Sequence, residues 1–266
     1  MIMPPWTPHS LWKPAVVTVG QEILYGERAN DNLLWLLRAF VRYGVPAAVG
    51  LILPDDEVVI GKHLETLVSL GYRPIFVSGG IGGTHDDRTR QGIALGLGRP
   101  LVKHSECFER LARRYGARFT EQRQRMAWLP EGARLIDNPI GAPGFCVDPV
   151  YAFPGFPEML YPMAEETLRR LLGSLPERGK RALELTLKVP EGDIAEEVER
   201  FANDHPGVDI GLYPRITPEG PMVTVRGRCW AHDPGAWTQV EGFLRKLEGS
   251  YPVAEALREL EGPGET

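Results

Sequence analysis

The sequence predicts an α/β protein in which a parallel sheet covered by helices is followed by a small α+β domain. Two observations support this fold class. Over residues 15–172, short apolar runs that suit buried strands alternate with longer segments of helical periodicity. From about residue 180 the pattern changes to one of period two, typical of strands with one wet face. Alternating strands and helices favour right-handed crossovers, so the sheet of the first domain is predicted to be parallel.

The first elements follow this alternation closely. Residues 15–19 form a valine-rich run that ends at Gly20, as expected of a strand buried on both faces. Over residues 33–41, leucine and phenylalanine recur at helical spacing, and Gly44 stands where a helix usually stops. Residues 47–53 are the next predicted strand.

The same cadence continues along the chain. A helix is predicted over residues 60–68, where Asp55 or Asp56 can supply the N-cap, and a strand follows over residues 74–77. Further elements are expected as helices over residues 105–116 and 157–172 and as a strand over residues 150–153.

The second domain is expected after a polar, proline-containing linker over residues 173–179. Its predicted elements are a strand over residues 183–189, a helix over 194–202, strands over 208–213 and 221–230, and a helix over 237–247. The predicted boundaries are a flexible tail over residues 1–14, a first domain over 15–172, a second domain over 180–250 and a C-terminal tail over 251–266.

Composition excludes several classes of protein. Hydrophobic residues make up 43% of the chain and charged residues 24%, close to the average for soluble globular proteins. No apolar run approaches the ~18 residues of a membrane helix, and the first residues lack the features of a signal peptide, so we expect a cytoplasmic protein without a membrane partner. A net charge of -5 gives no general attraction to nucleic acid, and none is expected as a partner. Three widely spaced cysteines indicate neither a zinc knuckle nor a disulfide framework.

The most unusual segment is the glycine-rich stretch over residues 78–89. It directly follows a predicted buried strand and precedes a helix. Glycines at such a junction let the backbone approach a ligand closely, and the free N–H groups of the following helix bind anions. The spacing matches neither GxGxxG nor a P-loop. We therefore expect a phosphate-binding loop that lacks both common nucleotide motifs.

Carboxylates accompany this loop. Asp86 and Asp87 suggest a divalent cation such as Mg²⁺, because hard metals take carboxylate oxygens and bridge to phosphate, but an aspartate at this junction is also a common N-cap. Glu22 follows the first strand, so a parallel sheet can bring it to the same edge. It is either a metal ligand or a residue that favours the start of a helix. His85 is a loop residue or a proton-transfer group.

Two segments of the chain together resemble a known family. Residues 20–26 followed by Asn32, and then residues 79–89, look like the paired signatures of the molybdopterin-binding domain of the CinA family of competence/damage-inducible proteins. Further matches in the family's order are Gln124 and residues 129–133, 138–145 and 153–159. The resemblance covers roughly residues 15–170, and the small domain that follows resembles, more weakly, the KH-type domain of CinA proteins.

The resemblance implies a fold and several activities. The first domain would be a three-layer, parallel-sheet domain of MoaB/Mog-like type, whose glycine loop holds the phosphate of a nucleotide or pterin. CinA-like proteins are associated with metal-dependent cleavage of the pyrophosphate in ADP-ribose, and a similar domain accompanies FAD synthase. Adenylyl transfer to molybdopterin, or binding without turnover, are the alternatives. Homo-oligomers are expected.

The resemblance also assigns residues to roles. Catalysis and the divalent metal would involve Glu22, Asp86 and Asp87. The phosphate-containing substrate would contact Gly20, Gln21, Asn32, Gly79, Gly80, Gly82, Thr84 and Gly155. No C-terminal amidohydrolase segment is present, so deamidase activity is not expected, and residues 171–253 hold no GxxG loop, so RNA binding is not expected.

Three positions depart from the family pattern. Gln21 replaces the aspartate of the usual GDE motif, Asn30 replaces that of the usual DTN motif, and Gly83 replaces a proline. An amide can still coordinate or donate a hydrogen bond, but it brings no negative charge to a cation and cannot act as a general base. These changes predict a protein that keeps its ligand and hydrolyses it slowly.

Overall fold

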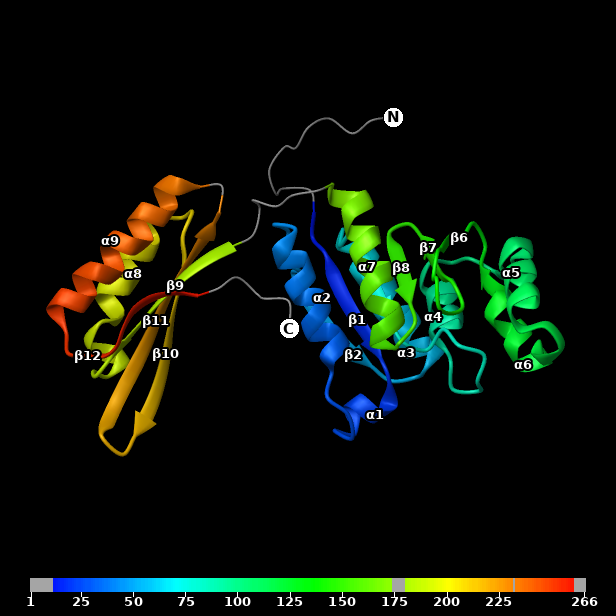
Figure 1. Cartoon of the computed structure of the whole chain (residues 1–266), viewed down its shortest axis with the longest axis horizontal. Coiled ribbons are helices and arrows are strands. Elements are labelled where there is room, and N and C mark those ends of the chain that lie inside the picture. The colour runs from blue at the N-terminus through cyan, green and yellow to red at the C-terminus, as the bar shows by residue number, and fades with distance from the viewer. Residues whose placement is uncertain (1–11, 174–179, 232, 261–266) are drawn as a thin grey trace. The chain divides into compact units, whose positions relative to one another are not determined.

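The computed structural model describes residues 12–173, 180–231 and 233–260, and the chain divides into two compact units on either side of residues 174–179 (Figure 1). Most of the predicted N-terminal tail and of the predicted linker lies outside the described residues. Lys13 and Pro14 do not belong to a tail: Lys13 pairs with Arg73, and the Pro14 carbonyl accepts a 2.8 Å hydrogen bond from Ala48. These hydrogen bonds satisfy the backbone carbonyl groups of Lys13 and Pro14, the two residues that directly precede the first strand.

The first unit is built on a six-stranded sheet with the order β2-β1-β3-β8-β7-β6. Strands β1, β2, β3 and β8 are parallel to one another, whereas β7 pairs antiparallel with both of its neighbours, β8 and β6. Their bounds are β1 Ala15–Val19, β2 Val49–Leu53, β3 Ile75–Ser78, β6 Arg134–Ile136, β7 Gly144–Val147 and β8 Val150–Phe153. Every residue of β1 and β3 is buried, as predicted for central strands.

The prediction of a wholly parallel sheet is wrong, because the sheet is mixed. Only Asp148 and Pro149 separate β7 from β8. Two residues can join antiparallel neighbours in a hairpin, whereas a parallel pair needs a crossover of a dozen or more residues. The short link therefore fixes the direction of β7.

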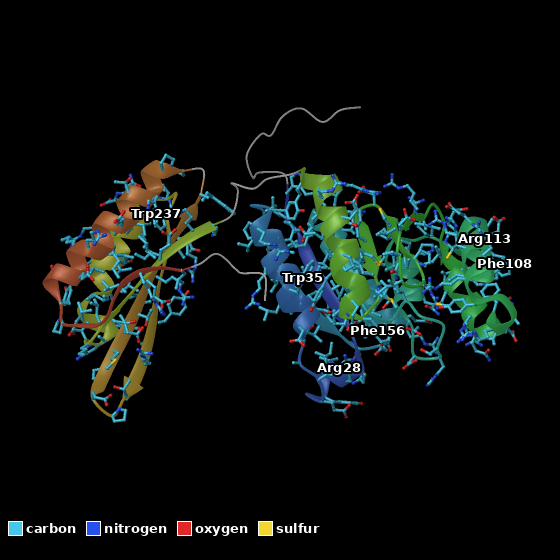
Figure 2. All side chains as sticks on the ribbon, in the orientation of Figure 1. Arg28, Trp35, Phe108, Arg113, Phe156 and Trp237 are labelled. Atoms are coloured by element: carbon cyan, nitrogen blue, oxygen red, sulfur yellow. The ribbon has the colours of Figure 1, made fainter. Side chains whose placement is uncertain are left out.

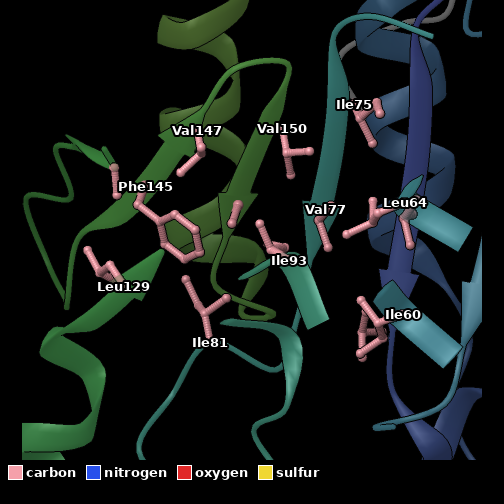
Figure 3. Close-up of a cluster of buried hydrophobic side chains, with 14 of the residues drawn as sticks. Ile60, Leu64, Ile75, Val77, Ile81, Ile93, Leu129, Phe145, Val147 and Val150 are labelled. Carbon is pink, nitrogen blue, oxygen red and sulfur yellow. The ribbon is translucent and has the colours of Figure 1, made fainter. Parts of the chain in front are cut away.

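Helices cover both faces of this sheet and make three layers (Figure 1). On one face, Ile60, Leu64 and Ile93 join the apolar cluster that contains Val77 of β3 (Figure 3). On the other face, the ring of Phe40 packs at 4.9 Å against Phe76. Successive strand residues point to opposite faces, which is why neighbours in β3 enter different layers. The helices of this unit are α1 Gln21–Leu24, α2 Asp31–Arg42, α3 Glu57–Ser69, α4 Thr89–Gly96, α5 Ser105–Tyr115, α6 Glu121–Gln124 and α7 Pro157–Leu172.

A small antiparallel pair, β4 (Leu101–Lys103) with β5 (Trp128–Pro130), brackets α5 and α6. Neither strand is predicted from the sequence, and neither are α6, β6 and β7. Each is three or four residues long. Segments of that length are too short to show a periodicity.

The second unit is a four-stranded antiparallel sheet with the order β10-β11-β9-β12, packed against two helices (Figure 1). Its elements are β9 Lys180–Leu187, α8 Ala195–Asp204, β10 Asp209–Thr217, β11 Gly220–Trp230, α9 Pro234–Ser250 and β12 Val253–Leu260. Leu183, Leu185 and Leu187 share an apolar cluster with α8 and α9, as the two-residue alternation predicts. The predicted wet face is wrong for this strand, because Glu184 and Thr186 between them are 5% and 1% exposed.

The predicted tail over residues 251–266 is wrong for residues 253–260, which form β12 and pair with β9. This segment is rich in alanine, glutamate, leucine and arginine, which favour helices. Pairing with a neighbouring strand overrides that weak preference, and the edge position lets its polar side chains face water.

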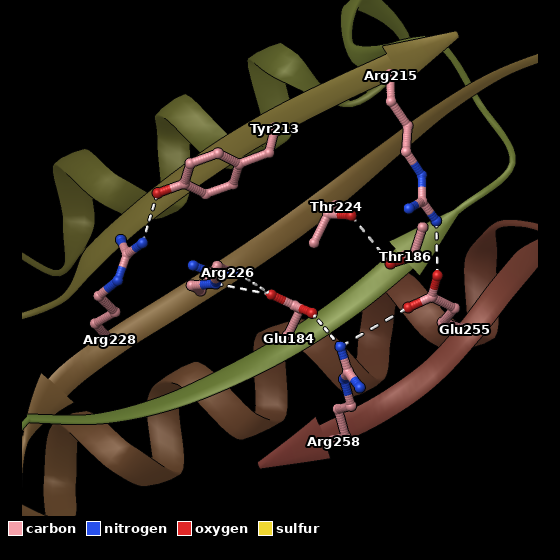
Figure 4. Close-up of polar contacts among 9 residues, drawn as sticks. All are labelled: Glu184, Thr186, Tyr213, Arg215, Thr224, Arg226, Arg228, Glu255 and Arg258. Atoms are coloured by element: carbon pink, nitrogen blue, oxygen red, sulfur yellow. Dashed lines mark hydrogen bonds and ion pairs between the residues drawn. The ribbon is translucent and has the colours of Figure 1, made fainter. Parts of the chain in front are cut away.

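The face of this sheet away from the leucines carries an ion-pair cluster (Figure 4). Glu184 is only 5% exposed, and its two carboxylate oxygens accept hydrogen bonds from Arg226 and Arg258. Burial raises the pKa of Glu184, but these two hydrogen bonds outweigh it, so the pKa lies below the ordinary glutamate value. The cluster keeps a buried carboxylate ionised.

None of the helices in the described part of the chain has the length and apolar character needed to cross a membrane.

Candidate functional site

A cavity of about 710 Å³ opens in the first unit where β1 and β3 end. Ligands of open α/β sheets bind at this edge, since loops and helix N-termini converge there. The cavity lining includes Gly20, Glu22, Asn32, Gly79, Gly80, Gly82, Thr84, Asp86, Asp87 and Gly155. Of the residues proposed from the sequence for catalysis or binding, Gln21 and His85 are absent from the lining.

The glycine loop needs glycine at its first two positions. Gly79 and Gly80 have φ angles of 95° and 65°, in the left-handed region that other residues avoid. A Cβ on Gly79 would also lie 2.3 Å from the carbonyl oxygen of Val19. The hydroxyl of Thr89 donates a 2.7 Å hydrogen bond to the Gly79 carbonyl and fastens the loop to the start of α4.

Asp87 holds the rest of the loop in shape. Its Oδ1 accepts a 2.8 Å hydrogen bond from the Gly82 N–H, and its Oδ2 accepts bonds from the N–H (2.8 Å) and the hydroxyl of Thr84. The N-cap of α4 is Arg88, without a side-chain cap bond. The N-cap alternative is therefore wrong for both Asp86 and Asp87.

Asp55 is a site residue that the sequence interpretation missed. Asp56 is the N-cap of α3, with bonds of 2.8 and 2.9 Å from Val58 and Val59. Asp55 is thereby left to line the cavity, where its Oδ2 accepts a 2.9 Å hydrogen bond from the Gln21 N–H. The sequence signal that could have identified Asp55 is the pair of adjacent aspartates after a strand, because only one of the two is needed as the N-cap of α3.

The carboxylates around the cavity influence one another. The pKa of Asp55 is raised, first by burial and then by the negative charges of Glu22, Asp86 and Asp87, while the hydrogen bond from Gln21 opposes this. Such a set of acids is destabilised by its own repulsion, and a bound cation relieves it.

These carboxylates fit a cation that is bound together with a phosphate. Among the described residues, no three histidine, cysteine, aspartate or glutamate side chains are grouped closely enough to hold a metal alone. Mg²⁺ is usually bound through one or two carboxylates with phosphate oxygens and water completing its shell. The site therefore suits a metal that arrives with its ligand better than a resident one.

Two buried hydroxyls form the floor of the cavity. Thr18 and Ser78 are register partners on β1 and β3 and are 1% and 0% exposed. Neither hydroxyl has a hydrogen-bond partner in the described structure, although both residues line the cavity. The same holds for Nδ2 of Asn30 and Oδ1 of Asn32. Buried polar groups are normally paired, so these four atoms indicate a polar ligand.

The positions that depart from the family pattern have structural roles here. Asn30 Oδ1 accepts a 3.1 Å hydrogen bond from the Leu33 N–H at the start of α2, a capping role that aspartate fills equally well. At Gly83, a Cβ would lie 2.4 Å from the carbonyl oxygen of Gln122, so glycine lets α6 approach the loop closely. Neither change removes a contact that holds the loop together.

The loop after β8 closes another side of the cavity. Asn32 Nδ2 donates a 2.8 Å hydrogen bond to the Gly155 carbonyl and so ties the start of α2 to this loop. Phe156 follows, is 62% exposed and lines the cavity. Figure 2 shows Phe156 and Arg28 at the same edge of the first unit. Arg28 also lines the cavity and forms no ion pair within the described part of the chain.

The comparison with known proteins agrees with this geometry. Residues 15–174 match a family model described as "Probable molybdopterin binding domain". The chain belongs to this molybdopterin-binding domain family. Within it, the chain has CinA-like relatives, which confirms the resemblance to CinA proteins.

Three similar proteins illustrate the likeness. A protein from Aeropyrum pernix is 33% identical over 259 residues, which cover 93% of this chain and 94% of that protein. A CinA-like protein from Geobacter sp. (strain M21) is 31% identical over 259 residues, and the chain covers 61% of its length. A crystal structure of the protein CinA, of unknown function, from Thermoplasma acidophilum is 30% identical with a TM-score of 0.56, covering 60% of this chain and 99% of that one.

Proposed function

We propose that the cavity binds a phosphate-containing nucleotide or pterin and that, with a divalent cation such as Mg²⁺, the protein hydrolyses a pyrophosphate of the ADP-ribose or FAD type. The observation that carries this proposal is the meeting of a glycine loop with the carboxylates of Glu22, Asp55, Asp86 and Asp87 around one cavity. Glycine loops accept phosphate, and carboxylates accept the cation that accompanies it.

The phosphate end of the ligand is bound by the glycine loop, the start of α4 and two hydroxyls that lack hydrogen-bond partners in the described structure. The backbone at Gly79 and Gly80 offers close approach, and the N-terminus of α4 favours an anion. The hydroxyls of Thr18 and Ser78 donate to phosphate oxygens and become satisfied when the ligand binds. Phosphate binding thus removes the energetic cost of leaving these two buried hydroxyls without hydrogen-bond partners in the free protein.

Asp55 is the carboxyl group best suited to accept a proton from water. Burial is the first cause of its raised pKa and persists when a cation offsets the neighbouring negative charges, so Asp55 is a stronger base than an ordinary aspartate, and its Oδ2 is oriented by the Gln21 N–H. As water attacks one phosphorus atom, its proton passes to Asp55, and the P–O bond to the leaving phosphate breaks. ADP-ribose would yield AMP and ribose 5-phosphate. A bound divalent cation supplies the positive charge that stabilises the phosphate oxygens.

Binding without turnover is the second candidate, favoured by the amides of Gln21 and Asn30 where the family pattern has aspartates. Adenylyl transfer to molybdopterin uses a similar pocket and remains an alternative enzyme activity. For the second unit we retain the KH-type assignment, supported by its strand, helix, strand, strand, helix order, to which the structure adds a last strand, β12. Self-association remains a prediction, and a single-chain mass by light scattering at all concentrations would contradict it.

Calorimetric titration of the full chain tests the binding proposal. ADP-ribose, FAD, AMP and molybdopterin are titrated in EDTA and then in Mg²⁺, and cleavage is followed by chromatography. We expect ADP-ribose or FAD to bind in EDTA, to bind more tightly with Mg²⁺, and to be cleaved when the metal is present. Binding with no cleavage in Mg²⁺ would favour the second candidate, and no binding by any of the four would refute both.

A further inference from the structure

The cavity has an apolar side as well as a polar one. Ile140, Phe156 and Met159 line it, and we call these three residues the ring wall. Phe156 is 62% exposed and Ile140 is 49% exposed. Single exposed apolar residues are common on protein surfaces, but several that converge on one polar cavity indicate a ligand with an apolar face.

The ring wall is held firmly on the side of Ile140. The side chain of Asn138 accepts a 3.1 Å hydrogen bond from the Ile140 N–H and donates a 2.8 Å bond to the Ala142 carbonyl. Gly141 packs so closely that a Cβ there would lie 2.6 Å from the Sδ of Met159. The exposure of Ile140 is therefore a property of a fixed loop.

Backbone carbonyls of the ring wall, and that of Gly155 beside it, are already in use as hydrogen-bond acceptors. Arg114 donates to the carbonyl of Ile140, Asn32 donates to that of Gly155, and the first turn of α7 donates to that of Phe156. The side chains of the wall carry no oxygen or nitrogen. A planar ring placed here gains packing and stacking contacts, whereas the wall gives little means of reading the polar edge of that ring.

We infer that the ring wall stacks on the planar ring of the bound ligand without reading its edge, so that adenine, guanine and pterin rings bind alike. Stacking on an aromatic side chain tolerates different rings because every base has a π-face. A site that hydrogen-bonds the edge would instead reject the wrong ring strongly. Selectivity then comes from the phosphate end of the cavity. This inference rests on the proposed binding of phosphate there.

Calorimetric titrations in EDTA, where no metal-dependent turnover occurs, test the inference with the full chain. The ligands are ADP, GDP and methyl diphosphate, which lacks a ring. We expect the dissociation constants of ADP and GDP to agree within about threefold and both to be at least about tenfold lower than that of methyl diphosphate. Phe156→Ala should weaken ADP and GDP equally, by about tenfold, and leave methyl diphosphate unchanged, while Phe156→Tyr should restore ring binding.

Tyr25→Ala is the matched control, because Tyr25 is an aromatic residue 70% exposed on the same unit and lies outside the cavity lining. It should leave all three affinities unchanged. Tight binding of ADP with more than tenfold weaker binding of GDP, or the reverse, would show that the ring edge is read and would overturn the inference. So would a Phe156→Ala variant that binds ADP like the wild type. If methyl diphosphate and both nucleotides fail to bind, the proposed function itself fails.

Discussion

Asp87→Asn should weaken ligand binding even when no metal is present. Asp87 accepts three hydrogen bonds from the glycine loop, and an amide oxygen can replace only one of its two carboxylate oxygens. The substituted NH₂ group would face either the Gly82 N–H or the two donors of Thr84. The variant therefore loses at least one bond and removes the charge from the others.

The expected magnitude follows from these contacts. Hydrogen bonds to charged groups contribute about 1.5–3 kcal/mol and neutral ones about 0.5–1.5 kcal/mol, so losing one bond and weakening two costs about 4 kcal/mol for a buried site. Because two of the three bonds are exposed to water, we halve this to about 2 kcal/mol. If the loop must be ordered to bind, the dissociation constant rises roughly thirtyfold.

The assay is calorimetric titration of ADP in EDTA, with Asp86→Asn as the matched control. Asp86 is exposed and accepts neither of the backbone N–H bonds that Asp87 accepts from Gly82 and Thr84, and it shares with Asp87 only the side chain of Thr84. Asp86→Asn should therefore bind ADP in EDTA far more tightly than Asp87→Asn and close to the wild type. An Asp87→Asn variant that binds ADP normally in EDTA, and loses affinity only with Mg²⁺, would refute the argument and show that Asp87 is chiefly a metal ligand.

Three further predictions concern charge. Asp55→Asn should raise the melting temperature at pH 7, because the raised pKa of Asp55 means that its ionised form is penalised in the folded state. This gain in melting temperature should vanish below the ordinary aspartate pKa of about 4. Equal melting temperatures of the variant and the wild type at pH 7 would contradict the prediction. Gln21→Asp combined with Asn30→Asp should accelerate Mg²⁺-dependent cleavage of ADP-ribose by about tenfold or more, because position 30 lines the cavity and aspartate there adds negative charge for the cation. The rate is followed by chromatography, and an unchanged rate would show that the amides are no handicap. Glu184 has a lowered pKa, so its stabilisation is complete above about pH 4.3 and is lost as the pH falls through the lowered value. Circular dichroism melts of Glu184→Gln should accordingly show a weaker loss of stability between pH 5 and 2 than the wild type shows.

The central part of the fold could be predicted because its pattern is local. Residues 15–19 and 150–153 are strands with the predicted bounds, and residues 157–172 form the predicted helix. Strand β12 could not be recognised, since its residues prefer helix and its pairing with β9 depends on contacts far away in the sequence. The direction of β7 was likewise set by a two-residue link that local periodicity does not show.

The candidate site could be predicted where motifs are contiguous. The glycine loop and Glu22 follow strand ends, and neighbouring parallel strands bring such positions to one edge. Asp55 was missed as a site residue, because its position in the cavity depends on Asp56 being the aspartate that caps α3. Phe156 was missed because its position depends on the hydrogen bond from Asn32 to Gly155. The unpaired hydroxyls of Thr18 and Ser78 became apparent only from three-dimensional packing.

The central claim is that this cavity binds a nucleotide pyrophosphate and cleaves it with the help of a divalent cation. The most direct measurement is mass spectrometry of ADP-ribose incubated with the full chain and Mg²⁺, beside a sample in EDTA and a sample of Asp55→Asn. We predict AMP and ribose 5-phosphate in equal amounts from the wild type with Mg²⁺, and intact ADP-ribose in the other two samples. Intact ADP-ribose in all three, under conditions where calorimetry shows it bound, would contradict the claim.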